Sequence, residues 1–252
     1  MSSFGLAWQF LTILPWWKSG REVTPRLLGQ SMAFYPSIGL LLGLILWVIH
    51  LLISPAFPRA LGDGLIITLL VILTGALHLD GLADTLDGLA AGKAPEERLR
   101  IMRDHRVGTF GVVGLILILG LKFLALQSLP DEVSGRALVV ALVLSRWSMV
   151  QLTYRAPYAR QGGGLGLPFK ENLRKREMFI AAVTSLVFSF LFFRFRGAML
   201  WVGVGIFALL FQAFFGKKIG GITGDILGVA NETSEVLALI LTSGMLRVGW
   251  AF

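Results

Sequence analysis

Seven apolar stretches, most of them close to the ~20 residues that a helix needs to cross a bilayer, constrain this chain more than any other feature. A backbone surrounded by hydrocarbon must satisfy its own hydrogen bonds, so stretches of this length become helices. The sequence therefore predicts an all-α, polytopic membrane bundle that forms a single integral membrane domain over residues 1–252. The predicted spans are residues 34–54, 64–82, 107–129, 137–154, 178–193, 197–215 and 226–246.

The composition supports a membrane protein and narrows its chemistry. Hydrophobic residues make up 55% of the chain and charged residues 15%, against about 25% charged in soluble domains. The chain has no cysteine, which excludes disulfide and thiolate chemistry, and its only three histidines, at positions 50, 78 and 105, argue against a histidine-rich zinc site. The net charge of +8 predicts attraction to membrane lipid or to an anionic substrate. We expect no nucleic-acid partner.

The N-terminus and the loop charges predict an orientation. Residues 4–17 are apolar and hold three tryptophans, but they are too short to span, which indicates a helix lying in the membrane interface. If the N-terminus is cytoplasmic, 16 of the 23 Lys and Arg residues fall in cytoplasmic segments and five on the opposite side, with Lys122 and Arg146 left inside the bilayer. The positive-inside rule therefore predicts a cytoplasmic N-terminus.

An acidic motif follows the second apolar stretch: His78-Leu79-Asp80-Gly81-Leu82-Ala83-Asp84-Thr85-Leu86-Asp87-Gly88. Spacings of four and three place Asp80, Asp84 and Asp87 on one face of a helix. Such carboxylates repel one another unless a cation lies between them, and their oxygens suit Mg²⁺, Mn²⁺ or Ca²⁺. A solvated helix end is the alternative. Carboxylates at a membrane edge are costly and usually functional, so we favour a metal site.

Further charged residues fall on the same predicted side. Arg103 and Arg106 lie in the loop after the acidic motif, and Asp225 begins the last span after the glycine-rich residues 220–224. Carboxylates that hold Mg²⁺ beside guanidinium groups that hold phosphate are what phosphoryl transfer requires. Glycines before a helix let the backbone approach an anion, although they are also common in ordinary turns.

Three segments together resemble the cobalamin synthase family, the membrane-bound adenosylcobinamide-GDP ribazoletransferases. The resemblance also extends to residues 10–15 and to Ser145-Arg146. His105 departs from the family pattern, in which a small residue such as serine is expected at this position. We therefore assign His105 no essential role. The segments that carry the resemblance are residues 78–88, Ile101-Met102-Arg103-Asp104-His105-Arg106-Val107-Gly108-Thr109 and Thr223-Gly224-Asp225-Ile226-Leu227-Gly228.

The resemblance implies a late step of vitamin B12 synthesis in the bacterial inner membrane, with the active site facing the cytoplasm. Adenosylcobinamide-GDP would be joined to α-ribazole, or to its 5′-phosphate, with release of GMP and with Mg²⁺ as cofactor. Either Asp104 or an unliganded member of the acidic motif takes the proton of the attacking hydroxyl. The sequence does not specify the preferred benzimidazole riboside or the oligomeric state. The candidate residues are Asp80, Asp84, Asp87 and Asp225 as metal ligands, Asp80, Asp84 and Asp104 in catalysis, and His78, Arg103, Arg106, Arg146 and Lys217 in substrate binding.

Two other functions use some of the same residue types. A CDP-alcohol phosphotransferase also displaces a nucleoside monophosphate, but it has an arginine shortly after the first Asp-Gly, where this chain has Ala83-Asp84. An ion-coupled transporter could use Glu232, Glu235 and Arg146 as coupling groups. It would also have repeated halves, and the sequence has none.

The charged residues inside the last and fourth spans predict an ion pair. At 1.5 Å per residue from the inner boundary, Glu235 lies about 15 Å deep and Arg146 about 13 Å deep. Charges at such depth seldom stand alone. We therefore expect Arg146 to pair with Glu235 or Glu232, and the alternative is that Arg146 reaches the substrate phosphate.

Overall fold

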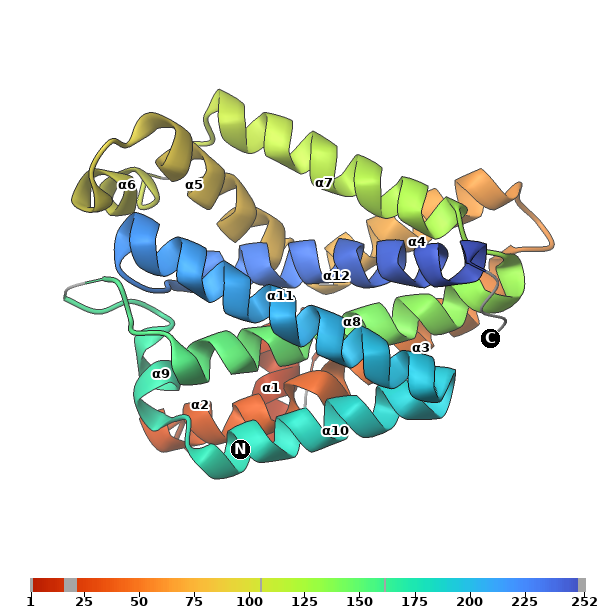
Figure 1. Cartoon of the computed structure of the whole chain (residues 1–252), viewed down its shortest axis with the longest axis horizontal. Helices are drawn as coiled ribbons and strands as arrows, with labels where there is room; N and C mark the ends of the chain where they lie inside the picture. Colours follow the sequence, from red (N-terminus) through yellow and green to blue (C-terminus); the bar gives the residue numbers. More distant parts are fainter. Residues whose placement is uncertain (1, 16–21, 105, 161, 249–252) are drawn as a thin grey trace.

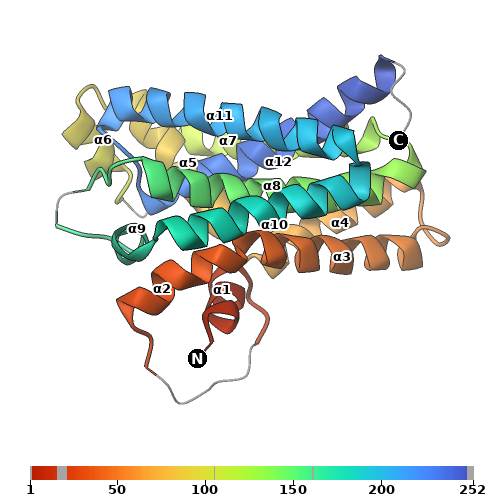
Figure 2. The same cartoon turned by 60° about the horizontal axis from the view of Figure 1, so that its bottom comes forward.

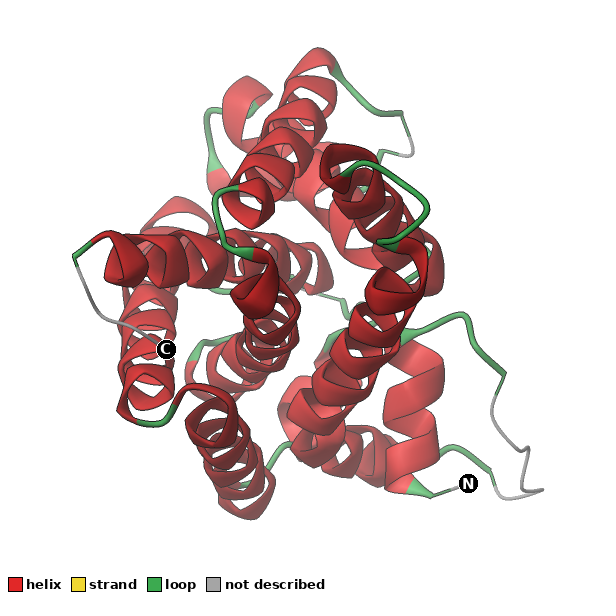
Figure 3. Ribbon diagram, turned by 90° about the vertical axis from the view of Figure 1, so that its right-hand side faces the viewer, coloured by secondary structure: helices red, strands yellow, loops and turns green. Residues whose placement is uncertain are grey.

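The computed structural model describes residues 2–15, 22–104, 106–160 and 162–248. Across these residues the regular structure is helical (Figure 3), with a single isolated bridge between Tyr158 and Ile222 and no strand. The predicted all-α fold is confirmed. The elements are α1 (Ser3–Leu11), α2 (Pro25–Ser31), η1 (Met32–Phe34), α3 (Tyr35–Ile53), α4 (Arg59–Leu73), α5 (Leu77–Ala91), α6 (Pro95–Ile101), α7 (Thr109–Gln127), α8 (Asp131–Arg155), α9 (Leu167–Asn172), α10 (Lys175–Phe193), α11 (Phe195–Ile219) and α12 (Gly224–Arg247).

Six helices among the described residues are long and apolar enough to cross a membrane, and the bent pair α4–α5 makes a seventh span if it is counted as one. This agrees with the prediction of about seven spans. Nearly all residues of α8 and most of those of α12 are buried, whereas at most about a third of the residues are buried in each of the other single-helix spans. The bundle is therefore organised around α8 and α12, with the remaining spans beside them (Figure 1).

The second predicted span, residues 64–82, is not one helix, and this prediction was wrong. The chain breaks after Leu73, and the axes of α4 and α5 differ by 86°. Gly75 has φ 60° and Ala76 has φ 54°, so two consecutive residues adopt the left-handed region that a right-handed helix cannot pass through. The break makes Asp80 part of the first turn of a separate helix instead of the end of a span.

The N-terminal segment lies on the outside of the bundle. A helix, α1, is present within the predicted residues 4–17, but it ends at Leu11 and packs against α2 (Figure 2). Its place in the membrane interface stays a prediction. Ser2 caps α1 by accepting a hydrogen bond from the amide of Gly5, as N-cap serines do. The tryptophans at 16 and 17 and the basic residues 18 and 21 lie outside the described residues.

Two short helices occupy loops for which no helix was predicted. The polar segment 88–106 contains α6, and the basic segment 155–177 contains α9. Each has a proline in its first turn, where the missing N–H costs nothing. These helices fold back over the end of the bundle instead of leaving it.

The segments predicted to be cytoplasmic gather at one end of the bundle (Figure 1), which we call the polar end: α6, residues 156–160 and 162–166, α9 and the start of α12. Contacts between them confirm the grouping. Arg98 of α6 donates to the carbonyl of Lys218 at 2.7 Å, and the amide of Ala159 donates to the carbonyl of Ile222 at 2.8 Å. The turns that join α3 to α4, α7 to α8 and α10 to α11 lie at the opposite end.

Candidate active site at the polar end

The site is built on a crossing of α5 and α12 in which the two backbones touch. A Cβ atom at Gly81 would lie 2.7 Å from the carbonyl oxygen of Asp225 and 2.8 Å from its Cα. A Cβ at Gly228 would lie 2.8 Å from the carbonyl oxygen of His78. The two helices therefore approach where each has a glycine, and this approach places Asp80 beside Asp225.

Gly81→Ala tests the crossing. The added methyl group must displace the backbone of Asp225, so we expect the free energy of unfolding in detergent to fall by about 1–3 kcal/mol, as for overpacked cores. Gly120→Ala in α7 is the matched control, because a Cβ there meets nothing within 4 Å. The control should be neutral or stabilising, since alanine favours a helix more than glycine does. Equal effects at both positions would contradict the close crossing.

Three carboxylates, those of Asp80, Asp84 and Asp225, meet at this crossing. Asp80 is exposed, and the other two are half-buried. The carboxylates of Asp80 and Asp225 both repel that of Asp84, and Arg160 is the cation that attracts it. Arg160 also forms an ion pair with Asp225. The group is thus an anionic cluster with one guanidinium against it.

Asp87, the third member of the acidic motif, is buried and has different partners. Its carboxylate accepts hydrogen bonds from the backbone amides of Gly108 at 2.6 Å and Gly111 at 2.8 Å. These amides start α7, where a helix has no backbone acceptors of its own. Asp87 therefore connects α5 to the first turn of α7, and its role as a metal ligand stays a prediction.

The carboxylate cluster has the donor chemistry of a magnesium site. Within the described residues, no three His, Asp or Glu side chains lie close enough together to hold a metal ion by themselves. Mg²⁺ does not require one, because it is usually held by one or two carboxylates together with water and substrate phosphates. Asp80, Asp84 and Asp225 offer the hard oxygen atoms it prefers, and their mutual repulsion favours a bound cation. These residues fit Mg²⁺ bound with a phosphate group.

Arg160 was missed by the sequence analysis and is central to the site. It lies in the loop between α8 and α9, which the bridge from Tyr158 to Ile222 holds against the start of α12. Its Nε is buried and has no hydrogen-bond partner. Together with Arg100 and Arg103 it lines an open cavity of about 530 Å³ beside α6. No local pattern marks Arg160, because only the tertiary contact with α12 brings it to Asp225.

Comparison with known proteins identifies the family. A family model described as cobalamin-5-phosphate synthase matches residues 3–243. The chain belongs to this family. The adenosylcobinamide-GDP ribazoletransferase of Syntrophobacter fumaroxidans is 40% identical over 240 residues, which cover 94% of this chain and 96% of that protein. The protein of the same name from Geotalea daltonii is 41% identical over 235 residues, covering 93% and 94%. No solved structure matches the chain significantly.

The family assignment confirms the resemblance carried by the acidic motif. It does not favour the CDP-alcohol phosphotransferase or the transporter. The other residues predicted for the site have different positions in this cobalamin-5-phosphate synthase family member. Arg103 lines the open cavity, whereas Asp104, Arg106 and Lys217 are exposed. The amide of Arg106 donates to the carboxylate of Asp104 at 3.2 Å.

Nothing in the described part of the chain joins Asp104, Arg106 or Lys217 to the carboxylate cluster, so their catalytic and binding roles stay predictions. His78 is buried beside the cluster and lines a second cavity with Asp80, Arg160 and Asp225. His105 lies outside the described residues.

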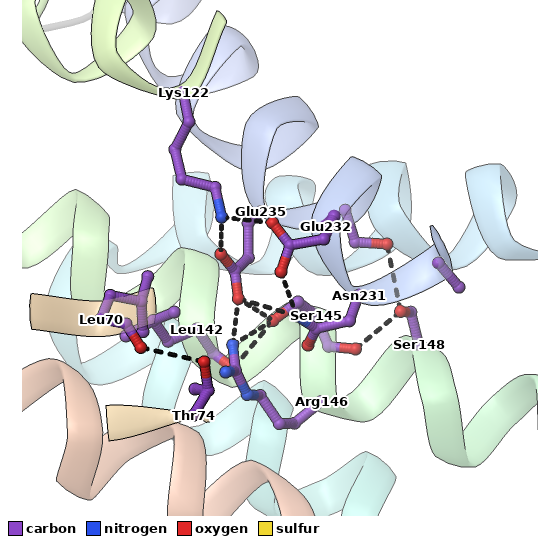
Figure 4. Close-up of polar contacts among 12 residues, drawn as sticks. Leu70, Thr74, Lys122, Leu142, Ser145, Arg146, Ser148, Asn231, Glu232 and Glu235 are labelled. Atoms are coloured by element: carbon purple, nitrogen blue, oxygen red, sulfur yellow. Dashed lines mark hydrogen bonds and ion pairs between the residues drawn. The ribbon is translucent and has the colours of Figure 1, made fainter. Parts of the chain in front are cut away.

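A buried charge network lies deeper in the same bundle (Figure 4). Arg146 donates to Glu235, so the predicted ion pair is confirmed. Lys122, for which the sequence predicted no partner, donates to both Glu232 and Glu235 at 2.6 Å each. Two cations thus balance two anions, and the network joins α7, α8 and α12. Arg146 is fully buried, and its role in substrate binding stays a prediction.

Proposed function

We propose that this chain joins adenosylcobinamide-GDP to α-ribazole, or to its 5′-phosphate, with release of GMP. Family membership supports the reaction, because the relatives are named for it. The meeting of Asp80, Asp84 and Asp225 with Arg160 at the α5–α12 crossing is the observation that carries the proposal. This cluster combines the oxygen donors of a magnesium site with a guanidinium that can bind phosphate. Its residues lie up to 145 positions apart in the sequence.

The side chains have distinct tasks in the proposed transfer. One or two of Asp80, Asp84 and Asp225 would hold Mg²⁺, which when bound would supply positive charge for the phosphate oxygens. Arg160 offers its unpartnered Nε–H to a phosphate oxygen, and Arg103 provides a second guanidinium from the open cavity. The ribazole hydroxyl attacks the phosphorus that bears the cobinamide arm, and the bond from that phosphorus to the oxygen of GMP breaks. A carboxylate of the cluster, or Asp104, takes the hydroxyl proton.

The test is direct. Purified protein in detergent is incubated with Mg²⁺, adenosylcobinamide-GDP and α-ribazole, and GMP is measured by chromatography. We expect one GMP for each corrinoid product. Formation should stop when EDTA removes divalent cations and return with added Mg²⁺. GMP formation that does not require α-ribazole, or that persists in EDTA, would contradict the proposed reaction or its metal dependence.

We propose further that the polar end faces the cytoplasm in a bacterial inner membrane. The absence of cysteine makes this measurable, because a single cysteine can be placed on a cysteine-free background. Lys217→Cys, at the polar end, should resist a membrane-impermeant maleimide in intact spheroplasts and react after lysis. Phe57→Cys, in the turn at the opposite end, should react in intact spheroplasts. The reverse pattern would invert the proposed orientation.

A further inference from the structure

A second cavity, less open than the first and called here the enclosed cavity, lies next to the carboxylate cluster, with a volume of about 170 Å³. Asp80, Asp225 and Arg160 lie in its wall, and Arg160 also lines the open cavity beside α6. The two cavities therefore share Arg160, the residue that pairs with Asp225. They differ in character, because the open one has three arginines in its lining and the enclosed one is walled mainly by apolar side chains.

The enclosed cavity has an aromatic wall assembled from three separate elements. Phe10 of α1, Tyr35 of α3 and Phe169 of α9 all line it. The ring centroids of Phe10 and Phe169 are 4.8 Å apart, and the rings of Phe10 and Tyr35 stack at 6.3 Å with an angle of 17°. Core aromatics also cluster in this way, but a close-packed core leaves few voids larger than a water molecule. An apolar cavity of about 150 Å³ is enough to bind benzene.

His78 adds a polar group that the protein does not satisfy. Its side chain is buried, with 3% exposed, and it lines the same cavity. Its Nε2 makes no hydrogen bond. Buried polar atoms are nearly always paired in native proteins, and an exception requires an explanation. A ligand with one acceptor in an otherwise apolar ring would provide the missing partner.

We propose that this cavity binds the benzimidazole base of the ribazole acceptor, which rests on the proposed function. The flat base lies against Phe10 and Phe169, and His78 Nε2–H donates to its unsubstituted ring nitrogen. The ribose then points toward Asp80 and Arg160, where its hydroxyl meets the diphosphate held on the open side. The corrin ring is far too large for the cavity. Guanine would leave several polar edge atoms unpaired among apolar side chains, so the nucleotide belongs on the basic side.

The experiment measures α-ribazole binding separately from turnover. Isothermal titration calorimetry in detergent, without the corrinoid, gives the Kd of the wild type and of two variants. Phe169→Leu removes a ring–ring contact and should raise the Kd about two- to tenfold. His78→Leu removes the proposed hydrogen bond and should raise it by a similar factor. In the GMP assay, both variants should raise the KM for α-ribazole and leave that for adenosylcobinamide-GDP unchanged.

Controls separate binding from folding. Phe215→Leu in α11 is matched to Phe169→Leu, because Phe215 is equally buried and also lies in an aromatic cluster, but it does not line the cavity. It should leave both KM values unchanged. His78→Leu removes an unpaired buried nitrogen, so its thermal midpoint should hold or rise while α-ribazole binding weakens. If His78 had a purely structural role, His78→Leu would lower the thermal midpoint.

The inference is overturned if the wild type does not bind α-ribazole, if neither variant changes the Kd, or if the KM for adenosylcobinamide-GDP rises instead. Failure of the proposed function has a different signature. In that case the wild type forms no GMP from the two substrates, and the calorimetric Kd values still decide what the cavity binds.

Discussion

Asp84→Asn is expected to reduce kcat by about two orders of magnitude or more while the protein stays as stable as the wild type. The metal proposed at this carboxylate would contribute several kcal/mol of charge stabilisation, and each 1.36 kcal/mol is a factor of ten in rate. Stability should not fall, because the substitution removes a charge that Asp80 and Asp225 repel. Asp80→Asn should behave in the same way. GMP release and thermal unfolding in detergent measure the two effects.

Asp87→Asn is the control, because we expect it to lower stability, which Asp84→Asn should leave unchanged. Both hydrogen bonds from the amides of Gly108 and Gly111 end on the carboxylate of Asp87, and an asparagine side chain can accept with one oxygen only. The variant should therefore unfold at a lower temperature than the wild type, because a buried amide loses its acceptor.

The outcome that would contradict the first prediction is wild-type activity of Asp84→Asn at limiting Mg²⁺. It would remove Asp84 from the proposed ligands.

Arg146→Met should lower the free energy of unfolding by about 3–5 kcal/mol, the cost of leaving a buried charge without its partner. The variant changes a balanced network of two cations and two anions into one with an excess negative charge. Adding Glu235→Gln restores the balance and should recover much of the loss. Lys122→Met should be similarly destabilising, because both glutamates depend on that ammonium group.

A double-mutant cycle distinguishes a specific pair from a general charge balance. Arg146 contacts Glu235, whereas Glu232 has Lys122 as its cation. The coupling energy of Arg146→Met should therefore be larger with Glu235→Gln than with Glu232→Gln. Equilibrium unfolding in detergent and SDS measures it. Strict additivity with both glutamates would exclude the pair and leave the alternative, in which Arg146 serves the substrate phosphate.

The break between α4 and α5 shows where prediction from sequence ends. Residues 64–82 are as apolar as a span, and hydropathy cannot distinguish a straight helix from a bent pair. The left-handed conformation at Gly75 is compatible with its residue type, but the same conformation at Ala76 has no signal in the sequence. The direction that α5 takes after the break becomes visible only in its packing against α7 and α12.

The sequence by itself determined the fold class, the number of spans, the acidic motif, the family and the pairing of Arg146 with a glutamate. These follow from local properties, namely apolar length, spacing along a helix and the cost of a charge in hydrocarbon. The tertiary structure alone decided that Arg160 pairs with Asp225, that Lys122 shares two glutamates, and that Asp87 caps α7. Each is a contact between residues distant in sequence, whose partner depends on how the helices cross and where a glycine lets two backbones touch.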